Sequence, residues 1–425
     1  MEKQNMEVNF SKLKDKIKNK EVKVCVLGLG YVGLTIVKAI LSKGYKVIGY
    51  DISLEKINKL KKGESYIVDV KNEDIKNYLY KDFFPTNRNI DIKDCDIYIV
   101  AVPTPLNENE EVELKYVYKA IRDIRKNLDD GNLIIFESTL PPGATEEIIY
   151  PKLKKSEKSF FLCFSPERIN PGSGHPVEEI PKIISGIDEE SLSLGTFFYS
   201  QIFSRIFPVS STKVAEYIKL LENSFRFINI SFINEFAKLT SKDGVDVFEV
   251  IEGAKTKPYG FTPFYPNWGV GGDCIPTVPM FLVQRGKSLG FRFSSIEYSN
   301  LINKSMPYFW YERVKKFLKK RVFVLGVTYK KDVNDLRNSQ VLKFIEILLN
   351  KKIDISYFDP FIDEIKINDK VLKSEKINKT KLKKFDLIVI GTNHSNLPYD
   401  ILIEIKKPVL DPYGILPKTK YTISF

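Results

Sequence analysis

The residue whose chemistry is easiest to name is Cys274, in the stretch Gly-Val-Gly-Gly-Asp-Cys-Ile-Pro-Thr-Val-Pro that runs from Gly269 to Pro279. Glycine lets a backbone approach a ligand closely, and the prolines stiffen the residues after the cysteine because proline fixes φ and lacks an N–H donor. An ionised cysteine sulfur on such a loop is a strong nucleophile when it is partly exposed beside positive charge. The alternative is a small buried residue beside a tight turn.

A glycine-rich turn near the amino end, Gly28-Leu29-Gly30-Tyr31-Val32-Gly33, forms the second group of candidate residues. It follows the apolar run 22–27 and precedes a helical pattern over 34–41 and a strand-like run, 46–50, closed by Asp51. Strand, glycines, helix, strand and acid in this order predict a dinucleotide-binding βαβ unit. Asp51 suits the two ribose hydroxyls and would repel a 2′-phosphate, which favours NAD over NADP. The alternative is a glycine turn in an unrelated α/β unit.

Each part of the glycine-rich turn has a role in such a unit. Gly28 allows the tight turn, Gly30 lets a pyrophosphate approach the backbone, and Gly33 lets the helix pack on the strand. The helix N-terminus, at Tyr31 and Val32, supplies donors and a positive dipole end for the phosphates.

Polar residues follow three further apolar runs, 96–102, 133–136 and 160–164. In a parallel open sheet, the residues just past the strand ends line the ligand crevice. Each cluster alone could be turn punctuation, but successive strands that end in polar clusters indicate a site. The residues placed there for cofactor or substrate are Thr104, Ser138, Thr139, Glu167 and Arg168.

One long helix is predicted over 213–241, because apolar residues recur there at helical spacing. They cover most of its circumference, so the helix is expected to be buried between domains or against a second subunit. Lys219 and Asn223 stand at i, i+4 on one face of this helix. The alternative for these two residues is a solvent-facing pair.

A second α/β unit is predicted from a strand at 321–325, with further strands at 353–358, 387–390 and 408–410. It has no Gly-x-Gly-x-x-Gly, so we expect it to be built like a nucleotide-binding half without binding NAD. Its polar cluster could hold a second, phosphorylated ligand, since arginine matches phosphate oxygens bidentately. The cluster comprises Lys330, Asp332, Asp335 and Arg337.

The fold class predicted from these elements is α/β, with two Rossmann-like doubly wound domains joined by a long central helix and a helical middle region. A chain of 425 residues is long enough for two or three domains. The predicted domains are 1–210, which binds NAD, 211–318, which is helical and carries the cysteine loop, and 319–425.

Composition excludes several classes of function. The net charge is +12, but lysines and acids are interspersed without a basic, aromatic-rich run, which argues against nucleic-acid binding. No run is long enough to cross a bilayer and the lysine-rich start lacks a signal core, so we expect a cytoplasmic protein. The four cysteines, of which three sit in strand-like runs, predict reduced thiols without a zinc site. With two histidines in all, His175 and His394, histidine acid–base chemistry is not expected.

Taken together, these motifs resemble the nucleotide-sugar 6-dehydrogenases, the UDP-glucose and UDP-N-acetylhexosamine dehydrogenase family, from about residue 22 to 414. The Ser-Pro-Glu-Arg-Ile-Asn-Pro-Gly run (165–172) and the stretch 260–266 look most like the UDP-N-acetylglucosamine branch. The other matching motifs are Gly28–Gly33, Pro103-Thr104-Pro105, Glu137-Ser138-Thr139, Lys219 with Asn223, Gly271-Gly272-Asp273-Cys274-Ile275-Pro276, and Thr328-Tyr329-Lys330 with Asp332, Asp335, Arg337 and Ser339.

The resemblance implies a four-electron oxidation of a UDP-sugar C6 alcohol to a carboxylate with two NAD, for surface polysaccharide synthesis. In that scheme the Cys274 thiolate adds to a C6 aldehyde, and the resulting thioester is hydrolysed. Lys219 and Asn223 would stabilise oxyanions, and Lys219 could take the hydroxyl proton. Thr139 and Glu167 would hold the water and the proton chain.

The resemblance also implies the substrate contacts and a homodimer or higher oligomer. Arg337 and Lys330 would meet UDP, and Tyr259 or Phe261 would cover the uracil or the sugar. The full set of substrate-binding residues implied in this way is Glu167, Arg168, Lys219, Asn223, Tyr259, Phe261, Gly271, Lys330 and Arg337.

The cysteine loop departs from the family pattern at two positions. An aspartate usually stands four residues after the cysteine, where this chain has Val278, and acetamido-sugar members often carry histidine where it has Asp273. The alternatives are therefore a UDP-glucose dehydrogenase, or an impaired homologue that binds nucleotide sugar or NAD. A two-electron dehydrogenase or decarboxylase of the related hydroxyacid group is a third alternative, against which the second domain and the Cys274 loop argue.

Overall fold

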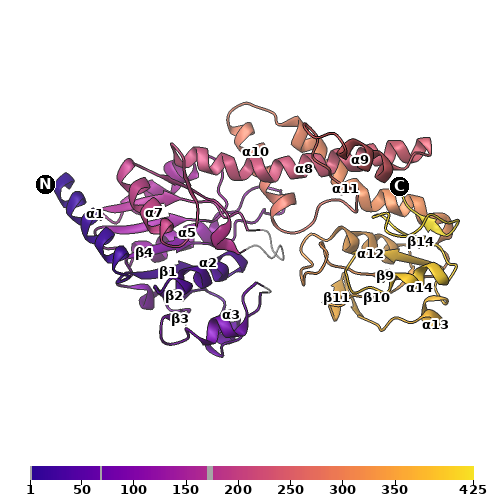
Figure 1. Ribbon diagram of the computed structural model, residues 1–425, viewed down its shortest axis with the longest axis horizontal. Coiled ribbons are helices and arrows are strands. Elements are labelled where there is room, and N and C mark those ends of the chain that lie inside the picture. Colours follow the sequence, from indigo (N-terminus) through magenta and orange to yellow (C-terminus); the bar gives the residue numbers. More distant parts are fainter. Residues whose placement is uncertain (1, 68, 170–175) are drawn as a thin grey trace. The chain divides into compact units, whose positions relative to one another are not determined.

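The computed structural model describes residues 2–67, 69–169 and 176–425, and it groups the chain into two compact units (Figure 1). The first unit comprises Met1–Glu222 with Met280–Leu289, and the second comprises Asn223–Pro279 with Gly290–Phe425. The predicted α/β class is confirmed. The division at 210 and 318 stays a prediction. His175 and residues 170–172 of the Ser-Pro-Glu-Arg run lie outside the described residues.

An eight-stranded sheet forms the centre of the first unit, in the order β3-β2-β1-β4-β5-β6-β7-β8. Neighbouring strands are parallel except β6 and β7, which are antiparallel. The strands are β1 (Lys23–Leu27), β2 (Lys46–Tyr50), β3 (Phe83–Thr86), β4 (Ile97–Val100), β5 (Asn132–Phe136), β6 (Phe160–Phe164), β7 (Lys182–Gly186) and β8 (Ile206–Pro208).

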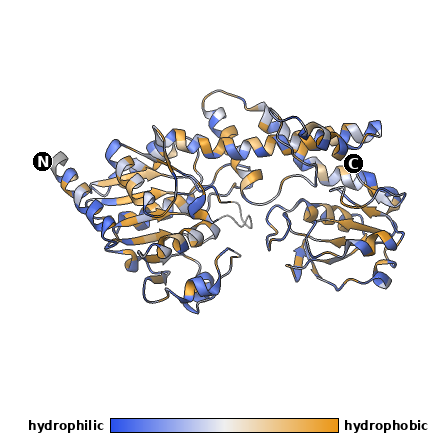
Figure 2. Ribbon diagram, viewed as in Figure 1, coloured by the Kyte–Doolittle hydropathy of each residue, from blue (hydrophilic) through white to orange (hydrophobic). Residues whose placement is uncertain are grey.

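Helices connect these strands and bury both faces of the sheet. Within β1, Val24 and Val26 pack into one apolar cluster and Cys25 and Leu27 into another, because successive side chains point to opposite faces. Figure 2 shows the strands as predominantly hydrophobic ribbon. The helices are α1 (Glu2–Lys18), α2 (Tyr31–Ser42), α3 (Leu54–Lys61), α4 (Asn72–Lys76), α5 (Lys115–Arg125), α6 (Tyr150–Lys154) and α7 (Glu189–Ser200).

The predicted strands of this unit are confirmed to within about two residues at each end, and three others were missed. Strand β7 escaped prediction because it begins with Lys182, although that residue is buried. Cys25 and Cys163 lie in strands, but Cys95 lies in the turn before β4, so the prediction of three strand cysteines is wrong for this residue. Among the described residues, none of the four cysteines takes part in a disulfide bond.

A five-stranded parallel sheet, in the order β10-β9-β13-β14-β15, forms the centre of the second unit, beside an antiparallel pair, β11 and β12. The strands are β9 (Arg321–Leu325), β10 (Asp354–Phe358), β11 (Glu364–Ile367), β12 (Lys370–Lys373), β13 (Leu387–Ile390), β14 (Val409–Leu410) and β15 (Thr422–Ile423). The helices are α9 (Val247–Lys255), α11 (Ser294–Val314), α12 (Gln340–Asn350), α13 (Lys379–Leu382) and α14 (Tyr399–Glu404).

Two more helices carry candidate residues, α8 (Thr212–Asp243) and α10 (Cys274–Ser288). The long helix predicted over 213–241 is therefore confirmed as α8. Burial over most of its circumference is not found within the single chain, since Phe225, Phe232 and Leu239 are at least half exposed.

A buried acid on α8 anchors the loop that follows β5. The Glu216 carboxylate accepts hydrogen bonds from the Gly143 N–H (2.5 Å) and from the N–H and hydroxyl of Thr145 (2.9 and 2.7 Å). Gly143 has a φ of +89°, which favours glycine there. Burial raises the pKa of Glu216 to about 7, against the lowering effect of these bonds. The loop that begins with Ser138 and Thr139 is thus tied to the helix that carries Lys219.

The Glu216 carboxyl predicts a measurable pH dependence of stability. Because its folded pKa is raised, the stability that it contributes is present below its unfolded pKa and is lost as the pH rises through the folded pKa. The unfolding free energy of the wild type minus that of Glu216→Gln should therefore fall by up to about 3 kcal/mol between about pH 4 and about pH 8. Urea unfolding across this range measures the difference.

The matched control is Glu235→Gln, an exposed position on the same helix. This variant controls for the removal of one carboxyl group from α8. A Glu216→Gln difference that does not fall across this pH range would contradict the raised pKa of Glu216.

Candidate active site

The glycine turn between β1 and α2 brings the strand and the helix into backbone contact. Gly28 has a φ of +92°, and its N–H donates to the Tyr50 carbonyl at 2.8 Å. A Cβ on Gly33 would lie 1.8 Å from the Gly28 carbonyl oxygen, so a side chain there is excluded. A Cβ on Gly30 would have no atom within 4 Å. Gly30 therefore leaves open space in front of the helix N-terminus.

Asp51 lies at the end of β2, is buried, and holds this turn in place. Its carboxylate accepts from the Leu29 N–H and the Ser53 N–H, both at 2.8 Å. Lys56 on α3 donates to the same carboxylate at 3.1 Å, an ion pair that the sequence analysis did not predict. Asp51 is thus oriented by two backbone donors and the Lys56 ammonium group.

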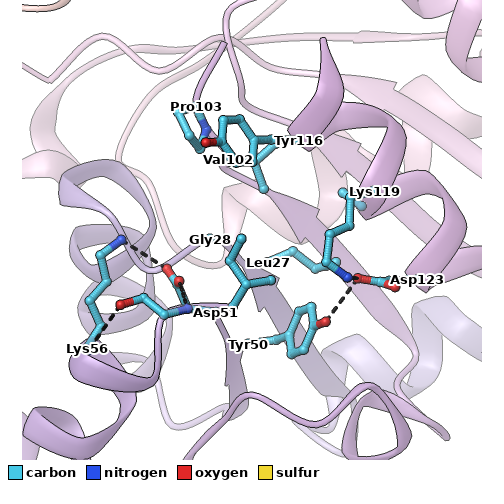
Figure 3. Close-up of a pocket in the computed structure, with 13 residues that line it drawn as sticks. Leu27, Gly28, Tyr50, Asp51, Lys56, Val102, Pro103, Tyr116, Lys119 and Asp123 are labelled. Atoms are coloured by element: carbon cyan, nitrogen blue, oxygen red, sulfur yellow. Dashed lines mark hydrogen bonds and ion pairs between the residues drawn. The ribbon is translucent and has the colours of Figure 1, made fainter. Parts of the chain in front are cut away.

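A cavity of about 230 Å³ opens beside Asp51 (Figure 3). At its side Asp123 on α5 accepts from the Tyr50 hydroxyl (3.0 Å) and from the Lys119 ammonium (2.8 Å). Burial, with the Asp123 carboxylate, raises the pKa of Tyr50. The other walls are Leu27, Gly28, Ile52, Ser53, Lys56, Val102, Pro103, Tyr116 and Ala120.

These features fit a dinucleotide. The Gly30 space meets the first turn of α2, where N–H groups are unpaired within a helix and attract phosphate. The buried Tyr31 hydroxyl has no hydrogen-bond partner among the described residues, so it could donate to a ligand. Val32 stands beside it in the same turn of α2. Thr104 follows β4 close to Val102 and Pro103, which line the cavity, and Ser138 donates to the Val102 carbonyl at 2.7 Å.

Glu167, just past β6, is the most constrained carboxylate at this edge. One of its oxygens accepts from the backbone N–H groups of Arg168 (2.5 Å) and Ile169 (2.8 Å), and the other from the Lys182 ammonium (2.9 Å). Lys219 on α8 donates to the Glu167 carbonyl at 2.5 Å. Burial acts to raise the pKa of Glu167, but Lys182 and the other donors lower it below its usual value. Glu167 and Lys219, two predicted site residues, are thus brought together.

The Lys182 ammonium also pairs with a second buried carboxylate, Glu137, at 2.8 Å. The Tyr199 hydroxyl on α7 donates to the other oxygen of Glu137. Burial raises the pKa of Glu137 to about 7; Lys182 opposes the rise and the Glu167 charge adds to it. The sequence analysis named Glu137 only as part of a motif and did not name Lys182.

Arg168 and Thr139 are two further predicted site residues of the first unit. Arg168 is held by the Glu222 carboxylate at 2.6 Å and by the Pro181 carbonyl at 2.9 Å, which constrains its guanidinium. Thr139 follows β5 in the loop that Glu216 anchors, and it is partly exposed.

In the second unit, Cys274 is exposed and is the first residue of α10. A helix N-terminus stabilises a thiolate by its positive dipole end. The preceding glycines pack on the protein itself, because a Cβ on Gly271 would lie 2.7 Å from Tyr329 and one on Gly272 would strike the same ring. These two glycines therefore let the loop backbone pack closely against Tyr329.

Arg337 fixes the cysteine loop to the segment after β9. Its guanidinium pairs with Asp335 (2.7 Å) and with Asp273 (2.8 Å), and its carbonyl accepts from the Gly272 N–H at 2.8 Å. The hydrogen bonds to Asp335 raise the pKa of Arg337 above its usual value, and the charges of Asp273 and the neighbouring Cys274 act in the same direction. Burial opposes this rise. The structure thus brings Cys274, Gly271 and Arg337 together.

A cavity of about 220 Å³ lies within the second unit, next to this loop. Tyr259 and Phe261 are exposed in the loop after α9, and the Lys257 ammonium group lies 5.1 Å from the ring centre of Tyr259. The cavity walls include Lys330, Lys331, Gly271, Tyr329, Ser339 and Gln340.

The second unit repeats the strand-end geometry of the first. The Gly326 N–H donates to the Phe358 carbonyl at 2.8 Å, and the Val327 N–H donates to Asp359 at 2.7 Å. The next long helix, however, begins only at Gln340, so no helix N-terminus follows the turn directly. For this physical reason, the second unit does not repeat the arrangement of a glycine turn followed directly by a helix N-terminus.

Buried His394 supports the Lys330 loop. Its Nδ1 accepts from the Asp332 N–H (2.9 Å), so its Nε2 carries the hydrogen and faces Asp359 at 3.2 Å and Thr328 at 3.1 Å. This histidine is therefore part of the scaffold of the cavity.

Three residues that matter for the site were missed by sequence reasoning: Lys182, Glu216 and His394. Glu216 could have been found, since it stands one turn before Leu220 on an apolar stripe of the helix. Lys182 and His394 gave no local signal, because their partners lie far away in the chain.

Within residues 2–67, 69–169 and 176–425, no three metal-ligating side chains gather into a group that could hold a metal ion. In the same part of the chain, no helix has the length and apolar character needed to span a membrane.

Comparison with known proteins matches three consecutive parts of the chain to one family. Models of the UDP-glucose/GDP-mannose dehydrogenase family match residues 22–204 (NAD binding domain), 213–305 (central domain) and 323–417 (UDP binding domain). A UDP-N-acetyl-D-glucosamine 6-dehydrogenase of Pseudomonas aeruginosa is 36% identical over 358 residues, 81% of this chain and 84% of the relative. A UDP-N-acetyl-D-mannosamine dehydrogenase of Methanocaldococcus jannaschii is 34% identical over 348 residues, 80% of this chain and 79% of the relative.

Solved structures agree. The UDP-D-ManNAc dehydrogenase of Pyrococcus horikoshii has a TM-score of 0.85 at 32% identity, covering 95% of this chain and 98% of that one. The three family domains follow one another along the chain, in agreement with the glycine turn, the buried Asp51 and the exposed thiol described above. The chain therefore belongs to the NAD-dependent UDP-glucose/GDP-mannose dehydrogenase family.

Proposed function

We propose that the protein oxidises the C6 alcohol of a UDP-N-acetylhexosamine to the carboxylate, with UDP-N-acetylglucosamine ahead of UDP-N-acetylmannosamine and UDP-glucose as substrate. The observation that carries this proposal is Cys274, the one exposed thiol among four cysteines that the structure describes, at the first residue of a helix. The names of the relatives support the acetamido sugars. The product would feed surface polysaccharide synthesis in the cytoplasm.

Cys274 accounts for a four-electron rather than a two-electron oxidation. NAD, when bound, supplies the hydride acceptor. The Cys274 thiolate adds to the C6 aldehyde, which gives a tetrahedral carbon from which a second hydride can leave, and the thioester that results is opened by water. A chain without a thiol at this position would stop at the aldehyde.

Polar and charged residues on α8 and past the ends of β5 and β6 would handle protons and developing charge. Lys219 and Asn223, one turn apart on α8, would stabilise the oxyanions, and Lys219 could accept the hydroxyl proton. Glu167, held ionised beside Lys182, would activate the hydrolytic water together with Thr139.

The substrate nucleotide would bind to the second unit. Lys330 and Gly271 line its cavity, and Arg337 would meet a phosphate once one carboxylate partner gives way, since guanidinium binds phosphate bidentately. Exposed Tyr259 and Phe261 would stack on the uracil or the sugar. Arg168 would act by holding its segment, because its guanidinium is bound to Glu222.

A specific observation favours a second candidate, an impaired homologue that only binds nucleotide sugar or NAD. Val278, where an aspartate is usual, is buried one turn after Cys274 on α10 and can neither pair with a cation nor activate water.

We further propose a homodimer through α8 and α11. Phe225, Phe232 and Leu239 recur every seven residues on α8 and are exposed, so they form one apolar stripe. An apolar stripe of this length is typical of an interface with a second copy, and two-fold symmetry is the usual arrangement. The matching exposed residues on α11 are Tyr298, Leu301 and Tyr308.

Cofactor binding is tested by two glycine variants. Gly30→Ala should leave the melting temperature unchanged, because the position is open and has an ordinary φ of −72°, but should weaken NAD binding at least about tenfold. Gly33→Ala should destabilise the fold by ~1–3 kcal/mol, since its Cβ would overlap the Gly28 carbonyl. Calorimetry measures both quantities. Equal NAD affinity in Gly30→Ala and the wild type would remove the cradle from the proposed site.

Catalysis is tested by counting NADH formed per UDP-N-acetylglucosamine, with the sugar limiting. We expect two per sugar for the wild type and fewer than two for Cys274→Ser. Glu167→Gln should accumulate a covalent sugar adduct on Cys274, detected by mass spectrometry, because thioester hydrolysis would be slowed. No NADH with any of the three UDP-sugars, while NAD still binds, would favour the impaired homologue.

The dimer is tested by Phe232→Glu, which would place an unpaired charge in the proposed interface. The dimer dissociation constant should rise at least about tenfold, as measured by analytical ultracentrifugation. Ile403→Glu, at an exposed apolar position on α14, is the control and should leave it unchanged. A monomeric wild type would refute the proposal.

A further inference from the structure

Two buried carboxylates share one buried ammonium group in the first unit. Lys182 at the start of β7 lies 2.8 Å from Glu137 and 2.9 Å from Glu167, and the side chains of all three are at most 7% exposed. Glu137 follows β5 and Glu167 follows β6, so neighbouring parallel strands deliver both acids to the same edge. A lysine at the first residue of a strand would ordinarily reach water, and here it does not.

The charges of these three residues do not balance among themselves. With both acids ionised the cluster would carry one net negative charge away from water, which is costly in a low dielectric. Glu167 has three donors for its carboxylate, two of them backbone N–H groups, whereas Glu137 has Lys182 and the Tyr199 hydroxyl. The better-served acid, Glu167, therefore keeps the charge when only one can.

Further groups hold Lys182 and close the cluster off. The Lys182 ammonium lies 5.4 Å from the ring centre of Tyr199 and 5.2 Å from that of Phe203, a cation–π arrangement on the side away from the acids. The charged and titratable groups that face the two carboxylates are Lys182, Lys219 and Tyr199, with Cys163 facing Tyr199, whereas Arg168 contributes only its backbone N–H.

We propose that Lys182 and Glu137 are positioning residues for the oxidation, with Lys182 fixing the Glu167 carboxylate and Glu137 competing with Glu167 for that one ammonium group. This inference rests on the proposed function of Glu167. When Glu137 is protonated, Lys182 serves Glu167 alone; when Glu137 ionises, the one ammonium group is shared between two carboxylates, and the charge already on Glu167 opposes that ionisation. The direction in which Glu137 is shifted, toward a pKa of about 7, places this exchange in the neutral range.

The first test needs no activity. Infrared spectra of the full-length protein, with carbon-13 glutamate and without substrate, follow carboxyl titration between about pH 4 and about pH 9. Glu137→Gln should remove one carboxyl that titrates near pH 7, and Glu167→Gln should lower the titration of the Glu137 carboxyl by about one pH unit, through loss of a nearby like charge. Glu216→Gln, which removes the other buried acid near pH 7, is the control and should leave the Glu137 band in place. An unmoved Glu137 band in Glu167→Gln would overturn the inference.

The second test uses the pH profile of kcat/KM. Lys182→Met should move the acid limb to higher pH and lower kcat at least about tenfold, whereas Glu137→Gln should leave the limb in place, because Glu137 is already protonated at the pH where Glu167 titrates. Lys182→Arg should restore most of kcat, and Tyr199→Phe, which keeps every charge, should leave the limb in place. A shift in the infrared titration without a shift of the limb in Lys182→Met would show that Glu167 is not the catalytic acid or base, which separates failure of the proposed function from failure of the coupling.

Discussion

The backbone contact between β1 and α2 is the constraint on which the first unit depends. Gly33 can come within contact of the Gly28 carbonyl only because Gly33 has no side chain, and this contact constrains the angle at which α2 leaves the sheet. The same angle points the helix N-terminus at the open space beside Gly30, so one steric condition both packs the helix and creates the position proposed to bind phosphate. Asp51 then locks the turn through the Leu29 N–H.

Buried charge at the carboxyl ends of the strands is the second theme. A parallel sheet with both faces covered must be apolar inside, so polar groups collect where the strands end. There the protein compensates each charge with specific partners: Asp51 with backbone donors and Lys56, Glu216 with Gly143 and Thr145, and the two acids with Lys182. These compensated charges tie loops to helices, and they give the edge of the sheet its chemical character.

The two units share one hydrogen-bond arrangement at the end of their first strand, but the segments that follow it differ. Gly326 and Asp359 reproduce the bonds that Gly28 and Asp51 make in the first unit. The segment after the strand differs between the units, since α2 begins at once after β1 whereas a long segment separates β9 from α12. That segment carries Arg337 and packs against the glycines before Cys274, so the second unit uses its turn to position the thiol loop.

Local patterns in the sequence were enough to predict the fold class, most strands, the long helix, the glycine cradle with Asp51 and the thiol at Cys274. Apolar periodicity and glycine spacing act over a few residues and do not need the rest of the chain. Features that depend on distant partners emerged only in the folded chain. Folding placed Lys182 inside a β-strand between Glu137 and Glu167, bound Arg168 to Glu222, and set Gly271 against Tyr329. Burial and pairing of a charge depend on the tertiary structure. A lysine in water needs no partner, whereas a buried ammonium group is stable only when carboxylates compensate its lost hydration.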